Sequence, residues 1–173
     1  MKKFLIHVGL ILTFIVIYLI QTIFFTHFTI AGIMPNVFII LMLYIGLYMG
    51  RTMGVIYGIL IDIWVGKSLG LTSVALALVG ILGGLFDKTL SKDSRLTVLL
   101  MGAICTIIYE IVLYFFNYMF FKINIEIYSF LKILFIETIY NVLLIIIVYP
   151  LMKATGYEIE NEIKGDRILT RYF

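Results

Sequence analysis

Charged residues are scarce in this chain, and their scarcity excludes a soluble domain. Asp, Glu, Lys and Arg make up 13% of the 173 residues, hydrophobic residues make up 63%, and the mean hydropathy is +1.14. A soluble domain carries about 25% charged residues. The excess of apolar surface cannot be hidden in a soluble core of this size. We therefore predict an integral membrane protein with no room for a soluble catalytic domain.

Sequence motifs of enzymes and of metal sites are also missing. There is no G-x-S-x-G, H-E-x-x-H, Walker A or G-x-G-x-x-G segment, so we expect no enzyme. His7 and His27 have no carboxylate or thiol at ligand spacing, which predicts no metal and no cofactor. The single Cys105 excludes an intrachain disulfide. Because no run of basic residues is present, we expect no nucleic-acid partner.

Six apolar segments separated by short polar breaks predict an all-α membrane domain at residues 1–152, followed by a tail at 153–173. The predicted spans are residues 4–25, 35–49, 53–65, 71–86, 96–121 and 129–152. The first is too long for a signal-peptide core and lacks a cleavage site, which predicts a retained span. The second and third are shorter than the hydrocarbon core, so either the bilayer thins or partner helices shield them. We expect the tail to be solvated or to fray, with a cytoplasmic contact through Ile159 and Ile163 as the alternative.

The positions of the basic residues predict which side of the membrane holds the termini. Six spans place both termini on one side, and Lys and Arg favour cytoplasmic segments. With the termini inside, three basic residues are external, namely Lys67, Lys122 and Lys132. The other ten are then cytoplasmic: Lys2, Lys3, Arg51, Lys88, Lys92, Arg95, Lys153, Lys164, Arg167 and Arg171. This imbalance favours cytoplasmic N and C termini.

Small residues recur at every fourth position in residues 50–70, and an aspartate fills one of these positions. The set, here called the glycine ridge, is Gly50, Gly54, Gly58, Asp62, Gly66 and Gly70, with Arg51 in a cytoplasmic turn. On a helix, Gly54, Gly58 and Asp62 fall within about 80° of one face, where small residues let two backbones approach closely. Gly66 and Gly70 are expected to be turn residues. The ridge could pack against another span of the chain or dock a partner's helix.

Three acidic residues lie inside the predicted spans. Asp62, Glu110 and Glu137 can all occupy the middle-to-outer layer of the membrane. An ionised carboxylate at the centre of a spanning helix costs roughly 2.5–3.5 kcal/mol on insertion scales. Asn141 is among the neutral hydrogen-bond partners nearby. Three uses remain open for the acids: hydrogen bonding within the bundle, a polar contact with a partner's helix, and a proton or cation path.

The spacing of these residues resembles the rod shape-determining MreD family. The matching segments are Pro35-Asn36, Tyr44-Ile-Gly46-Leu-Tyr-Met-Gly50-Arg51 and Gly54-x-x-x-Gly58-x-x-x-Asp62-x-x-x-Gly66-Lys67-x-Leu69-Gly70. The resemblance implies a non-catalytic protein of the bacterial cytoplasmic membrane that takes part in cell elongation. It implies MreC as the main partner, and MreB, RodA and a penicillin-binding transpeptidase as further partners. It also implies a fold like the substrate-binding components of energy-coupling-factor vitamin transporters, with Asp62 as the signature acid.

A small-molecule transporter, or the substrate-binding component of one, is the alternative function. Six short-looped spans with glycine-interrupted segments are also found in transporters. This alternative predicts a vitamin-like ligand that co-purifies in stoichiometric amount and raises the melting temperature of the protein.

Overall fold

The structure is a computed structural model that describes residues 2–65, 70–122 and 126–165. These residues form six α-helices and one short π-helix, and the described part of the chain has no strand beyond an isolated bridge between Ile30 and Ile33. The helices are α1 (Lys2–Leu19), η1 (Ile20–Phe24), α2 (Val37–Met49), α3 (Arg51–Val65), α4 (Leu71–Thr89), α5 (Arg95–Phe121) and α6 (Ile127–Lys164). Four of the helical segments are long and apolar enough to cross a membrane: Lys2–Phe24, Leu71–Thr89, Arg95–Phe120 and Ile127–Lys164. The predicted all-α class is therefore confirmed.

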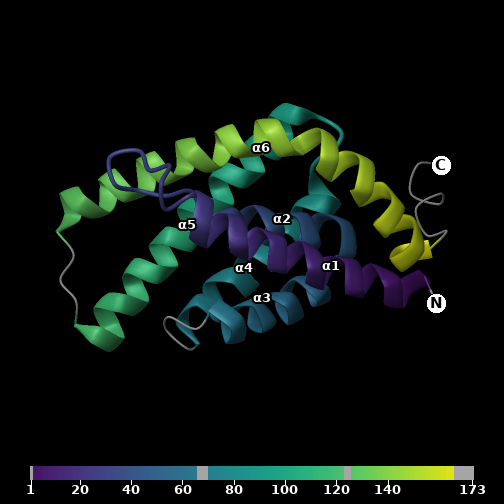
Figure 1. Cartoon of the computed structure of the whole chain (residues 1–173), viewed down its shortest axis with the longest axis horizontal. Helices are drawn as coiled ribbons and strands as arrows, with labels where there is room; N and C mark the ends of the chain where they lie inside the picture. The colour runs from purple at the N-terminus through teal and green to yellow at the C-terminus, as the bar shows by residue number, and fades with distance from the viewer. Residues whose placement is uncertain (1, 66–69, 123–125, 166–173) are drawn as a thin grey trace.

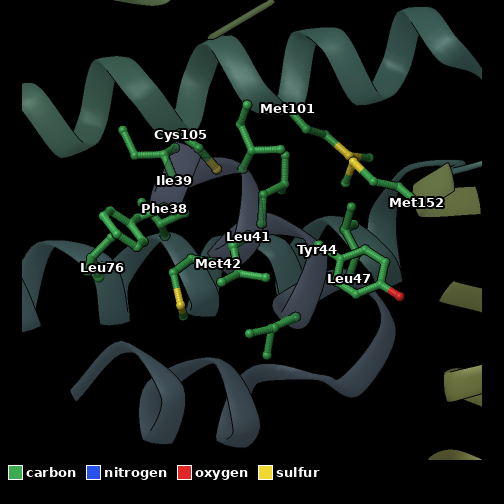
Figure 2. Close-up of a cluster of buried hydrophobic side chains, with 14 of the residues drawn as sticks. Phe38, Ile39, Leu41, Met42, Tyr44, Leu47, Leu76, Met101, Cys105 and Met152 are labelled. Carbon is green, nitrogen blue, oxygen red and sulfur yellow. The ribbon is translucent and has the colours of Figure 1, made fainter. Parts of the chain in front are cut away.

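Helix α2 lies at the centre of the bundle and contacts α1, α3, α4, α5 and α6 (Figure 1). All its residues from Phe38 to Met49 are buried. Figure 2 shows side chains of α2 meeting Leu76 of α4 and Met101 and Cys105 of α5. With 13 residues, α2 is only about 20 Å long. Its own chain surrounds it, so α2 needs no partner helix to shield it from lipid.

Helix α3 continues from α2 through a tight turn at Gly50, and then packs along α4. Gly50 has a φ of +93°, a backbone conformation that residues with a Cβ rarely adopt. The outer face of α3 carries exposed apolar side chains, with Ile63 61% and Trp64 70% exposed. Exposed apolar residues of this size are typical of a surface that lies against lipid or another protein.

Helix α6 extends well beyond its predicted end at residue 152. It runs unbroken to Lys164, passes through Pro150, and changes direction along its length (Figure 1). Gly156 and Glu160 are buried, and Ile159 and Ile163 pack against the core. The expectation of a solvated or fraying tail is wrong for residues 153–164, because their apolar side chains pack inward and their buried charge is paired. Residues 166–173 lie outside the described part of the chain.

Helix α1 is the most peripheral element. Leu10 is its only buried residue, whereas α1 exposes large side chains such as Phe4 and Leu12. Its first turn is held by an ion pair between Lys2 Nζ and Glu162 Oε1 at 2.9 Å. The start of α1 and the end of α6 therefore lie at the same end of the bundle (Figure 1).

Candidate functional site

The middle of the glycine ridge packs α3 against α4 at backbone contact distance. A Cβ added to Gly54 would lie 2.7 Å from the Cα of Gly80, and one added to Gly58 would lie 2.7 Å from the backbone nitrogen of Ala77. Real Cβ atoms essentially never come this close to backbone atoms. Both glycines face the inside of the bundle, so in this structure their surface is occupied by the chain's own α4.

Helix α4 uses glycines of its own to receive both α2 and α3. A Cβ on Gly83 would lie 2.8 Å from the carbonyl oxygen of Leu43, and one on Gly84 would lie 2.6 Å from the backbone nitrogen of Arg51. Small residues on both partners let helices in a membrane gain van der Waals contact without a hydrophobic driving force. Helices α2, α3 and α4 therefore form a backbone-packed core that tolerates no added side chain at these positions.

The ends of the ridge are turn residues rather than packing residues. Gly50 and Gly70 have φ values of +93° and +102°, and neither has an atom within 4 Å of the place a Cβ would take. Arg51 is exposed and begins α3. Gly66 lies outside the described residues. The spacing of four residues thus serves two purposes: helix contact at Gly54 and Gly58, and chain reversal at Gly50 and Gly70.

Asp62 is buried, with 2% of its surface exposed, and it holds the start of α4. Its Oδ2 atom accepts hydrogen bonds from the backbone N–H of Gly70 at 2.8 Å and from Ser73 Oγ at 2.6 Å. The first N–H groups of a helix have no partner within the helix, and negative charge is favoured near them. Asp62 therefore supplies from α3 the acceptor that the first turn of α4 lacks. Its Oδ1 atom is buried and has no hydrogen-bond partner among the described residues.

Glu110 of α5 and Glu137 of α6 face each other. Their carboxyl groups lie close enough to each other to interact directly. A hydrogen bond between two carboxyl groups requires a proton on one of them. Neither glutamate forms an ion pair within residues 2–65, 70–122 and 126–165, and Glu137 Oε1 has no hydrogen-bond partner there.

Asn141 and Gln21 secure the start of α2. Asn141 Oδ1 accepts a hydrogen bond from the backbone N–H of Asn36 at 2.8 Å, and Asn141 Nδ2 donates to Thr106 Oγ1 at 3.1 Å. Gln21, in the π-helix, donates to the carbonyl of Pro35 at 2.7 Å and accepts from the N–H of Val37 at 3.0 Å. These bonds satisfy backbone groups that a helix beginning inside the bundle would otherwise leave unpaired. Gln21 was not among the residues singled out from the sequence.

Four charged residues form a second feature that the sequence did not reveal. Lys92 and Lys164 each bridge the same two acids, Asp87 and Glu160, in a closed ring that we call the charge box. The four N···O distances lie between 2.6 and 2.9 Å. Lys164 also donates to the carbonyl of Leu47 at 3.2 Å. The box ties the end of α6 to the ends of α2 and α4. The i,i+4 spacing of Glu160 and Lys164 was the one local signal for it.

Among the described residues, no group of three or more His, Cys, Asp or Glu side chains could hold a metal ion. Cys105 is buried and free. The polar residues of the membrane domain bind backbone groups, each other or neighbouring hydroxyls, which is the behaviour of groups that fix helix positions.

Comparison with known families gives one match. The sequence model of the family described as rod shape-determining protein MreD matches residues 1–155. The chain belongs to the MreD family. Proteins of the MreD family are membrane proteins that determine rod shape, and the family is not known as an enzyme family. No curated protein and no solved structure matches the chain. The transporter alternative gains no support, and the expected likeness to vitamin-transporter components rests on the sequence resemblance alone.

Proposed function

We propose that this protein is a non-catalytic membrane scaffold of the rod-shape complex in the bacterial cytoplasmic membrane. In this role it controls cell shape and lateral peptidoglycan synthesis through contacts with MreC and, with it, MreB, RodA and a penicillin-binding transpeptidase. The protein crosses the membrane six times, with both termini in the cytoplasm. The family match supports the role in rod shape, and the pairing of Lys2 with Glu162 supports termini on one side.

The observation that carries this proposal is the backbone-packed core of α2, α3 and α4. A transporter component needs a site that encloses its ligand, and such sites are concave cavities with a few convergent polar groups. Here the glycines of α2, α3 and α4 close their part of the bundle, and Asp62 binds backbone. The groove of about 800 Å³ between α1 and α6 is lined almost entirely by apolar side chains rather than by convergent polar groups. A rigid core with apolar side chains exposed around it is better suited to holding partner helices at fixed positions.

Two linked experiments test the proposal. In a rod-shaped bacterium depleted of its own MreD, expression of this chain should restore rods, and the tagged chain should retain co-expressed MreC during purification. Gly58→Leu, which would collide with Ala77, should lose both properties. Retention of a stoichiometric small molecule, together with failure to retain MreC, would favour the transporter alternative.

A further inference from the structure

An apolar groove of about 800 Å³ runs along the outside of the bundle between α1 and α6, with α2 as its floor. Its walls are apolar almost throughout. Along α1 and the start of η1 it extends from Ile6 to Ile20, and along α6 from Leu144 to Ile159. These stretches of 15 and 16 residues contain 14 and 15 helical rises, which correspond to about 21–23 Å. The groove is therefore longer than the roughly 15 Å of one leaflet, half of a hydrocarbon core about 30 Å thick. A single lipid chain would leave part of it empty, whereas a spanning helix crosses both leaflets.

The wall of the groove on α1 contains Gly9, against which no other described helix packs. Every other glycine within the described helices has an atom of a neighbouring helix within about 3 Å of its missing Cβ, but Gly9 has nothing within 4 Å. Thr13, one turn later, also lines the groove, and its hydroxyl is bonded to the carbonyl of Gly9 at 2.9 Å. Two small residues four apart are the pattern that lets helix backbones approach in membranes. No described helix packs against the pair Gly9 and Thr13.

One end of the groove carries a single unpaired charge. Glu158 is the only charged residue in its lining, it is exposed, and it forms no ion pair with any described residue. Beside it, the hydroxyls of Tyr44 and Thr155 are hydrogen-bonded at 2.8 Å. This end lies near the start of α1 and the end of α6, which the proposed topology places in the cytoplasm. Membrane-spanning helices commonly carry Lys or Arg at their cytoplasmic ends, so a partner helix would bring the opposite charge.

We propose that this groove is the docking site for one membrane-spanning helix of a partner. The helix would lie against α1, α2 and α6, place a small residue opposite Gly9 and Thr13, and pair a Lys or Arg with Glu158. The inference rests on the proposed function, since the partner used to test it is MreC.

The test is co-purification of MreC with the full-length chain from membranes, combined with photo-crosslinking. Gly9→Leu adds a side chain whose Cβ meets no atom within 4 Å, and Leu144→Trp fills the groove from α6. Each should reduce the MreC retained by about tenfold, the change expected when about 1.4 kcal/mol of helix–helix contact is lost. Ile146→Trp is the matched control, because Ile146 is 49% exposed and points away from Leu144 on the same helix. The control should retain MreC as the wild type does.

The crosslinks and the charge provide the second half of the test. A photoreactive residue at position 144 should attach to the membrane-spanning helix of MreC, and one at position 146 should not. Glu158→Lys should weaken retention, and a Lys→Glu change at the cytoplasmic end of the MreC helix should restore it. All variants are checked for unchanged melting temperature, so a loss of folding is not read as a loss of docking.

The outcomes separate the inference from the proposed function. If Gly9→Leu and Leu144→Trp retain MreC as well as the wild type does, the docking site is elsewhere and the inference is wrong, while the scaffold function stands. Crosslinks from position 144 to lipid or to a second copy of this chain, with none to MreC, also overturn the inference. Failure of the wild-type chain to retain MreC at all would contradict the proposed function itself.

Discussion

Asp62 Oδ2 accepts the backbone N–H of Gly70 at 2.8 Å, eight residues along the chain. This bond joins the last turn of α3 to the first residue before α4, and Ser73 adds a second bond from inside α4. The glycine contacts at Gly54 and Gly58 align the same two helices along their length. Asp62, Gly54 and Gly58 thus hold the same two helices, α3 and α4, against each other.

The hydrogen bonds of Asp62 predict graded effects on stability. Asp62→Ala removes the charged acceptor of both hydrogen bonds, which should lower the free energy of unfolding by about 1–3 kcal/mol. Asp62→Asn keeps one acceptor oxygen and should cost less. Thermal unfolding in detergent measures both, with Ser73→Ala as a control that removes one of the two bonds. Equal losses for Asp62→Ala and Asp62→Asn would show that the charge, rather than the acceptor, matters.

Glycine positions predict opposite outcomes for the same substitution. Gly54→Ala places a methyl group 2.7 Å from Gly80 and should destabilise the fold by about 1–3 kcal/mol through overpacking. Gly9→Ala meets no atom within 4 Å and should change stability by less than about 1 kcal/mol. The ratio of folded to aggregated protein after purification, together with the melting temperature, compares them. A harmless Gly54→Ala would mean that α3 and α4 are further apart than described.

The charge box predicts a large difference between two neighbouring glutamates. Glu160→Gln breaks two ion pairs at 2.6 and 2.9 Å and leaves two partly buried lysines short of negative charge. Breaking a buried ion pair costs roughly 3–5 kcal/mol. Glu162→Gln removes only the exposed pair with Lys2, which is worth about 0–1 kcal/mol. Urea unfolding of the two variants measures the difference, and similar losses would show that the box contributes little.

The proposed topology predicts the location of the two ends of α6. A fluorescent protein fused to the C-terminus should fluoresce, because folding of the fusion requires the cytoplasm. Alkaline phosphatase fused after Lys122 should be active, because that loop is external in the proposed topology. Reversed results at both sites would place the charge box and Glu158 on the outer side, and would contradict the orientation.

The sequence predicted the positions of the helices well, but it did not predict which helices pack against each other. Hydropathy located six helices, and the spacing of four in residues 50–70 predicted that Gly54 and Gly58 pack a helix. Which helix packs against Gly54 and Gly58 depends on Gly80 and Ala77. The small size of these two residues does not show, from the sequence alone, which helix will pack against them. The burial of α2 could not be predicted either, because its uniform apolarity fits lipid contact as well as protein contact.

Polar contacts between residues far apart in the chain could not be predicted from the sequence either. The charge box joins residues up to 77 positions apart, and its members look like ordinary loop and tail charges in the sequence. The tail, which holds Glu160 and Lys164, was expected to be solvated or to fray. Asn141 was singled out as a neutral partner for the acids, but its closest contacts are the start of α2 and Thr106. Side chains that bond backbone have no fixed spacing to their targets, so one sequence does not reveal them.

The most direct test of the account is the shape of cells that depend on an Asp62→Asn chain. If Asp62 acts by accepting hydrogen bonds that position α4, cells expressing this variant at the wild-type membrane level should remain rods across external pH values. The Asp62→Ala variant, matched for expression, should give rounder cells. Round cells from a stably folded Asp62→Asn protein would contradict the account, because the negative charge itself would then be required.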